Sequence, residues 1–182
     1  SEKWISKILG TIDLIPDIAK TTKQWYESEK EELKRFKNII VIGYDKCLPA
    51  ATEGALKILE TVQCCVRYYE LEEFMHGIYH GIDKSTLILA LGNQSRHLNR
   101  MVRLLGYLKE HKNATTYLIS QNKVIKHDFS YPFIEDSLFV SFEYLTVLQV
   151  LGELMCHDRG VDLYDTVDEN FHEYMESYVY EK

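Results

Sequence analysis

Two short runs of apolar residues constrain the fold of this chain more than any other feature of its sequence. Residues 38–44 have the sequence NIIVIGY, and residues 86–92 have the sequence TLILALG. Such β-branched or aliphatic runs, ending near glycine, are typical of strands buried on both faces of a parallel sheet. Residues 67–71 and 115–119 predict two more strands, and residues 124–127 predict a short edge strand. The sequence therefore predicts a mainly parallel sheet of about five strands.

Segments with helical spacing of apolar residues separate these strands. They cover residues 4–14, 17–36, 50–65, 93–110 and 135–157. Pro16 is expected to end the first helix, because proline is tolerated in the first turn of a following helix. Strands that alternate with helices are joined by right-handed crossovers, so we expect a three-layer α/β/α, doubly wound sheet. Ligands bind at the carboxyl ends of the strands in such a sheet.

The chain is long enough for one domain, with 182 residues and no evident internal repeat. We expect linker helices over residues 1–37, the α/β domain over residues 38–160, and an acidic, tyrosine-rich tail over residues 161–182. This organisation places every strand of the sheet in one unit.

Charge and cysteine content exclude several classes of function. The net charge is −7, and nucleic-acid binding and docking to an anionic membrane both need a clustered basic surface. No apolar run approaches the roughly 20 residues that span a bilayer. The four cysteines (47, 64, 65 and 156) form no CxxC pair and are expected to be reduced thiols. A cytoplasmic location follows from that interpretation.

Three charged residues share one stripe of the helix predicted over residues 50–65. Glu53, Lys57 and Glu60 are four and three residues apart, so their side chains lie on the same face. A carboxylate whose pKa is tuned by burial or by a lysine is suited to proton transfer. The alternative is an ion pair on a solvent-exposed helix, and the spacing alone favours that alternative.

A second polar cluster follows the strand predicted over residues 67–71. It contains Glu73 and His76, and Gly77 allows a sharp turn or a close approach to a ligand. Histidine both accepts and donates protons near neutral pH, although a loop histidine beside glycine is more often structural. The spacing of Glu72, His76 and His80 resembles a metal site, but the glycines disfavour a regular helix and no HExxH motif occurs. No metal or organic cofactor is expected.

The turn after residues 86–92 is a candidate contact for substrate. Asn93 and Ser95 lie where a strand passes into a helix, which is a frequent position for anion binding. The alternative is that one of them caps the helix, which is the commoner role of these residues.

Three segments resemble one family. Residues 53–60 (EGALKILE) resemble the EGALKLKE segment in the second SIS (sugar isomerase) half of glutamine:fructose-6-phosphate amidotransferases. Residues 73–77 (EFMHG) resemble the GELKHGP loop of that family, at matching separation. Residues 92–97 (GNQSRH) are similar to a turn in fructoselysine-6-phosphate deglycases. The resemblance covers residues 38–162 and implies the SIS fold.

The resemblance also implies roles for individual residues. Glu60 matches the carboxylate that moves protons between C1 and C2 of an open-chain sugar phosphate. Lys57 matches a lysine beside that carboxylate, and Glu53 matches an acid that orders the helix. His76 matches the histidine that assists ring opening, usually from a neighbouring subunit. The implied ligand is a phosphorylated sugar or ketosamine, and we expect a homo-oligomer.

The chain departs from this family in ways that narrow the expected activity. Ile78 follows His-Gly where the family has proline, and no lysine occurs between Asp162 and Tyr180, where the amidotransferase has a catalytic lysine near the place of Phe171. A Ser/Thr-rich phosphate loop and a glutaminase segment are also missing from this sequence. We therefore expect the second SIS half of a phosphosugar isomerase or deglycase, incomplete without a first half. The alternative is a non-catalytic module for sugar-phosphate sensing or dimerisation.

Overall fold

The computed structural model describes residues 2–136, 138–164 and 169–176. Its sheet has five parallel strands in the order β2-β1-β3-β4-β5. The strands are β1 (Asn38–Gly43), β2 (Cys65–Glu70), β3 (Thr86–Gly92), β4 (Thr115–Ser120) and β5 (Phe129–Ser130). The strand order reverses direction at β1 and β3, which is where doubly wound sheets open a crevice.

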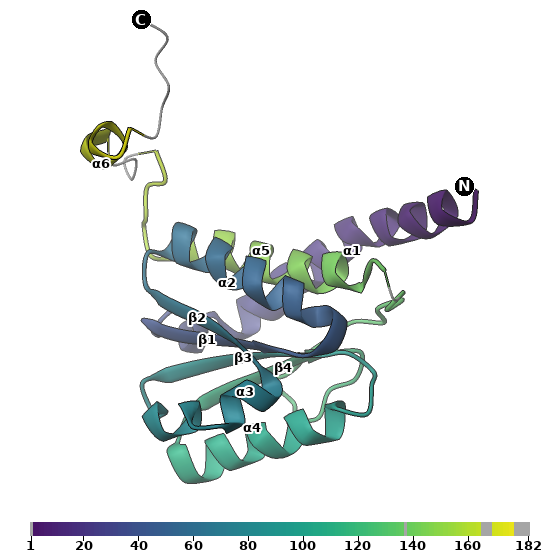
Figure 1. The fold of residues 1–182 in the computed structure, drawn as a ribbon, viewed down its shortest axis with the longest axis horizontal. Coiled ribbons are helices and arrows are strands. Elements are labelled where there is room, and N and C mark those ends of the chain that lie inside the picture. The colour runs from purple at the N-terminus through teal and green to yellow at the C-terminus, as the bar shows by residue number, and fades with distance from the viewer. Residues whose placement is uncertain (1, 137, 165–168, 177–182) are drawn as a thin grey trace, which may run out of the picture.

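Helices cover both faces of the sheet, which confirms the predicted three-layer architecture (Figure 1). The helices are α1 (Glu2–Leu33), α2 (Leu48–Val62), α3 (Leu71–Met75), α4 (Leu98–Lys112), α5 (Val140–Asp158) and α6 (Glu169–Tyr174), with 3₁₀ turns η1 (Asp45–Cys47) and η2 (Ile78–Gly81). In Figure 1, α1, α2 and α5 lie above the sheet, and α3 and α4 lie below it. None of the described helices combines the length and the apolar character needed to cross a bilayer.

The core is divided by the sheet into two apolar layers. Ile39 and Val41 belong to the layer between the sheet and helices α1, α2 and α5. Ile40 and Ile42 belong to the layer between the sheet and helices α3 and α4. This alternation is the period-2 geometry of a strand. It explains why β1 is apolar at consecutive positions, because both of its faces are buried.

The prediction that Pro16 separates two helices is wrong, because α1 is continuous through it. Proline has no backbone N–H, so the carbonyl of Ile12 loses its helical partner. Pro16 and Ile12 are both exposed, so water is available to that carbonyl. The second half of α1 packs into the core through Ile18, Tyr26 and Leu33. The division at residue 37 stays a prediction.

The predicted edge strand over residues 124–127 is also misplaced, because β5 lies at Phe129–Ser130. The buried carboxylate of Asp128 accepts hydrogen bonds from the backbone N–H groups of Val124 (3.1 Å) and Ile125 (2.8 Å). These bonds fold the segment into a turn. The helices predicted from residues 93 and 135 begin later, at Leu98 and Val140, because polar contacts hold both preceding segments as loops.

Candidate functional site

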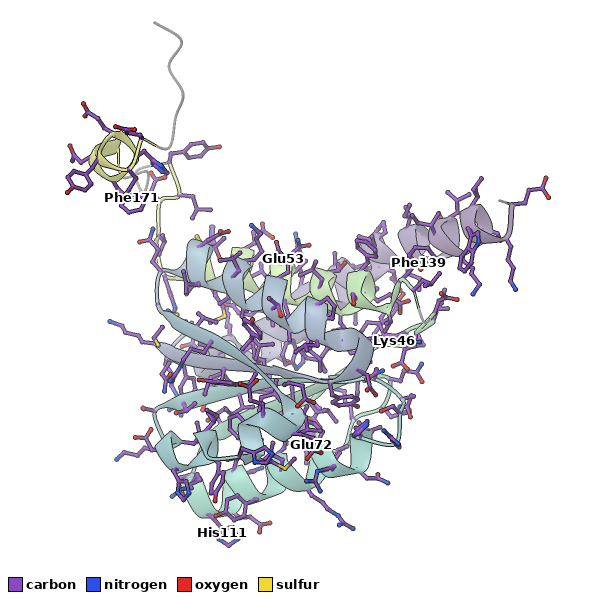
Figure 2. The ribbon with its side chains drawn as sticks, viewed as in Figure 1. Lys46, Glu53, Glu72, His111, Phe139 and Phe171 are labelled. Atoms are coloured by element: carbon purple, nitrogen blue, oxygen red, sulfur yellow. The ribbon has the colours of Figure 1, made fainter. Side chains whose placement is uncertain are left out.

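The Glu53–Lys57–Glu60 stripe lies on the outer face of α2. The ammonium of Lys57 is 2.8 Å from a carboxylate oxygen of Glu60 and 3.6 Å from one of Glu53. All three side chains are between about one third and one half exposed, at 43%, 37% and 48% in chain order. Figure 2 shows Glu53 on the side of α2 that faces away from the sheet. The structure thus brings these three predicted residues together at the surface.

The opposite face of α2 explains why the stripe points outward. Ala51, Ala55 and Ile58 are buried there against the sheet and α5. Gly54 is the point of closest approach, because a Cβ added to it would lie 2.2 Å from Leu148 Cδ1. The glycine of the EGALK segment therefore serves helix packing, which leaves the charged stripe on the free face.

The ion pairs set the charge state of Lys57. The hydrogen bond to Glu60, and the charges of Glu60 and Glu53, raise the pKa of Lys57 above its ordinary value. The lysine is therefore a cation at neutral pH. A permanent cation beside Glu60 stabilises negative charge, which suits an electrostatic role for Lys57.

A groove of about 690 Å³ lies beside this stripe, and sequence reasoning missed it. Its floor is formed by α2 and α5, with Lys57 and Thr61 on one side and Gln149, Glu153 and His157 on the other. The three α5 residues are four apart, which places them on one helix face. This polar stripe within an otherwise apolar helix was the available signal.

The second predicted cluster lies on the other face of the sheet. His76 follows α3 as its C-cap residue and is exposed, and Gly77 has φ +151°, which favours glycine. The backbone N–H of Glu73 donates to the Glu70 carboxylate at 3.0 Å, and Glu73 is exposed at the surface. Figure 2 shows Glu72 of the same helix across the sheet from Glu53. A single chain therefore does not bring His76 to Glu60.

Asn93 and Ser95 form the turn after β3, and neither is the N-cap of α4. Asn93 is buried, and its backbone carbonyl accepts a hydrogen bond from the Tyr44 hydroxyl at 2.6 Å. Ser95 Oγ accepts from the backbone N–H of His97, which is the N-cap residue, at 3.1 Å. The prediction that either side chain caps α4 is thus wrong, and the turn lies at the carboxyl end of β3, beside the point where the strand order reverses.

A pair of carboxylates that sequence reasoning missed holds this turn in place. Glu135 accepts from the backbone N–H of Gln94 at 2.8 Å and from the Tyr144 hydroxyl at 2.7 Å. Glu143 is fully buried, and burial raises its pKa above the ordinary value for glutamate. An acidic residue within the apolar α5 was the signal for Glu143. Glu135 thus holds the turn, and Glu143 in its turn accepts from the backbone N–H of Glu135 at 3.3 Å.

No group of three or more histidine, cysteine or acidic side chains among the described residues is arranged to hold a metal ion. Glu72 instead binds Arg100 Nη2 at 2.8 Å.

Comparisons with known proteins identify the family of this chain. The SIS domain model matches residues 32–124. Glutamine–fructose-6-phosphate aminotransferase (isomerizing) of Wigglesworthia glossinidia brevipalpis is 26% identical over 172 residues, which is 90% of this chain and 28% of that protein. A structure described as a candidate phosphosugar isomerase from Clostridium difficile 630 has a TM-score of 0.86 at 28% identity, covering 96% of this chain and 49% of that one.

A more distant structure shows the same fold. Glucosamine-6-phosphate deaminase of Thermotoga maritima has a TM-score of 0.64 at 21% identity, covering 90% of this chain and 47% of that one. The chain covers between 20% and 28% of the length of the curated relatives it matches. It carries a five-stranded parallel sheet of the same kind. Because the family model matches more than half of its residues, the chain belongs to the SIS domain family.

Proposed function

We propose that this chain supplies proton-transfer groups to an enzyme acting on phosphorylated sugars, as a phosphosugar isomerase or a ketosamine-6-phosphate deglycase. Glu60 takes the proton from one of the carbons C1 and C2 of the open-chain substrate and returns it to the other. Lys57 stabilises the negative charge that develops nearby. His76 donates the proton that opens the sugar ring.

The observation that carries this proposal is the exposed Glu60–Lys57 pair. Its carboxylate lies at the surface, 2.8 Å from a cation, and accepts no backbone hydrogen bond in the described residues. A carboxylate in that position is accessible to a substrate. The names of the relatives, which include phosphosugar isomerases and aminotransferases, support the same class of chemistry.

The position of His76 extends the proposal to assembly. Glu60 is on α2 and His76 follows α3, and these helices cover opposite faces of the sheet (Figure 1). A site that uses both residues therefore takes them from two copies of the chain. A first SIS half is proposed to complete it, and Glu53, Glu73, Asn93 and Ser95 are proposed substrate contacts.

The test follows proton transfer in the full-length protein. Fructose 6-phosphate and ketosamine 6-phosphates are incubated in deuterium oxide, and deuterium incorporation at C1 or C2 is followed by NMR. Glu60→Gln is expected to lower the rate about 100-fold or more. Glu110→Gln, at an exposed position of α4, is the matched control and is expected to leave the rate unchanged.

Two results would contradict the proposal. An unchanged rate in Glu60→Gln would remove Glu60 from the chemistry. Absence of exchange and turnover in the wild-type protein, with sugar-phosphate binding retained, would instead establish the alternative of a non-catalytic sensing module.

A further inference from the structure

A cationic pocket lies where α1, α2 and α5 end. It has a volume of about 530 Å³, which is within the range of small-molecule sites. Three of its lining residues are cations, and none is acidic. The lining consists of Lys34, Lys37, Val62, Gln63, Cys64, Cys65, Arg159 and Val161. This concentration of positive charge is unusual in a chain with a net charge of −7.

The cations of this pocket are only partly engaged. Lys37 is exposed and forms no ion pair with a described residue. Lys34 pairs with Glu31 at 2.7 Å, but Glu31 is 77% exposed, and such surface pairs contribute little stability. Arg159 donates to the carbonyl of Phe36, and its buried Nε has no partner among the described residues. The pocket therefore offers unused positive charge.

A structural explanation exists for part of this positive charge. Helix carboxyl ends carry partial negative charge and attract lysine and arginine. Lys34 lies at the carboxyl end of α1 and fits this explanation, whereas Arg159 donates to the Phe36 carbonyl in the connection between α1 and β1. Backbone hydrogen bonds are present at the ends of α2 and α5. The N–H of Gln63 donates to the carbonyl of Leu59, and the N–H of Arg159 donates to the carbonyl of Met155. Lys34 and Lys37 remain available to a ligand.

The pocket adjoins the groove beside Glu60 and Lys57. Val161 lines both cavities, and Gln63 and Cys64 follow Glu60 within about one helical turn. The groove presents Lys57, Glu153 and His157, which are polar groups suited to sugar hydroxyls. A ligand with an anionic end and a polyhydroxyl body fits the two cavities together.

We propose that the cationic pocket binds the phosphate group of a phosphorylated sugar whose body lies in the adjoining groove. Lys34 and Lys37 neutralise the phosphate, and Arg159 adds guanidinium donors, which match phosphate geometry well. The sugar part of this inference rests on the proposed function, whereas phosphate binding does not. The given sequence contains no Ser/Thr-rich phosphate loop, and this pocket would provide a phosphate contact in its place.

The two cysteines in the pocket lining allow a direct test on the full-length protein. Alkylation of Cys64 and Cys65 is followed by mass spectrometry with anionic iodoacetate and with neutral iodoacetamide. A cationic pocket favours iodoacetate, so the iodoacetate-to-iodoacetamide rate ratio is expected to fall in a Lys34→Gln/Lys37→Gln variant. Lys30→Gln is the matched control, because Lys30 pairs with Glu27 on the same helix outside the pocket lining.

Ligand protection then identifies the anion. Inorganic phosphate and glucose 6-phosphate are expected to slow alkylation, and glucose and matched ionic strengths of chloride are not. The double variant is expected to need at least about tenfold more phosphate for the same protection. Equal protection by chloride, protection by citrate but not phosphate, or no protection would each overturn the inference. Loss of protection with intact, Glu60-dependent turnover overturns only this inference, and protection without turnover overturns only the proposed function.

Discussion

Two acidic regions of this protein use carboxylates in opposite ways. On α2, Glu53 and Glu60 lie at the surface, and within the described part of the chain each pairs with the flexible ammonium of Lys57 alone. At the far end of the sheet, the carboxylate of Asp128 is buried and accepts three backbone hydrogen bonds, and Glu143 is fully buried in α5. The difference separates acids that shape the fold from acids that are free to act on a substrate.

The largest effect on stability is expected from removal of the buried carboxylate of Asp128. Asp128→Ala leaves the backbone N–H groups of Leu118, Val124 and Ile125 without their acceptor. We expect the free energy of unfolding to fall by about 3 kcal/mol or more. Urea denaturation measures this loss. A loss below about 1 kcal/mol would show that the turn re-forms its bonds with water.

The packing beneath the exposed stripe is tested at Gly54. Gly54→Ala places a methyl group against Leu148 at the closest point between α2 and α5, and we expect it to cost about 1–3 kcal/mol. Gly106→Ala on α4 is the matched control, because its Cβ would meet nothing within 4 Å. That variant should gain about 0.5–1 kcal/mol from helix propensity. Equal effects at both positions would contradict the assigned role of Gly54.

The buried acid Glu143 predicts a pH dependence. Its pKa is raised in the folded protein, so the native state holds the proton more tightly than the unfolded chain. Stability is therefore lost as the pH rises from the ordinary glutamate pKa through the raised one. Glu143→Gln stays neutral, so its melting temperature should gain on that of the wild type as the pH rises above the ordinary glutamate pKa of about 4.3. Glu153→Gln, at an exposed position of α5, is the control. If the difference in melting temperature from the wild type stayed constant with pH in Glu143→Gln, as is expected of the control, burial would not be the cause of the raised pKa.

The smallest effect is expected at the exposed stripe itself. Glu53→Ala removes a 3.6 Å ion pair between side chains that are more than one third exposed. The free energy of unfolding should change by less than about 0.5 kcal/mol. A loss above about 1 kcal/mol, measured by urea denaturation, would move Glu53 into the class of structural acids.

Much of the fold was predictable because its determinants are local. The apolar runs of β1 and β3 need burial on both faces, so they indicated a parallel sheet directly. The edge strand was not predictable, because Asp128 bonds to backbone groups that are ten residues away at Leu118. The continuity of α1 through Pro16 was also hidden, since the half of the helix that follows the proline is held by long-range packing of Ile18, Tyr26 and Leu33.

The candidate site was predictable only in part, for a geometric reason. The spacing of Glu53, Lys57 and Glu60 fixes their common helix face, and the structure confirms that arrangement. Their separation from His76 could not be predicted, because it depends on which face of the sheet α2 and α3 each cover. The groove was indicated only by the polar stripe of α5, because it forms where α5 packs beside α2. The cationic pocket joins residues near the ends of α1, α2 and α5, which are far apart in the sequence, so no local pattern predicts it.

The most direct test of the account asks whether Glu60 and His76 act together from two copies. Full-length Glu60→Gln and His76→Asn proteins are each assayed for sugar-phosphate turnover, and are then mixed under conditions that exchange subunits. Each variant alone should be nearly inactive. The mixture should recover about a quarter of wild-type activity, because half of the dimers are mixed and one of their two sites holds both native residues. A mixture that shows subunit exchange but stays as inactive as its components would contradict a shared site.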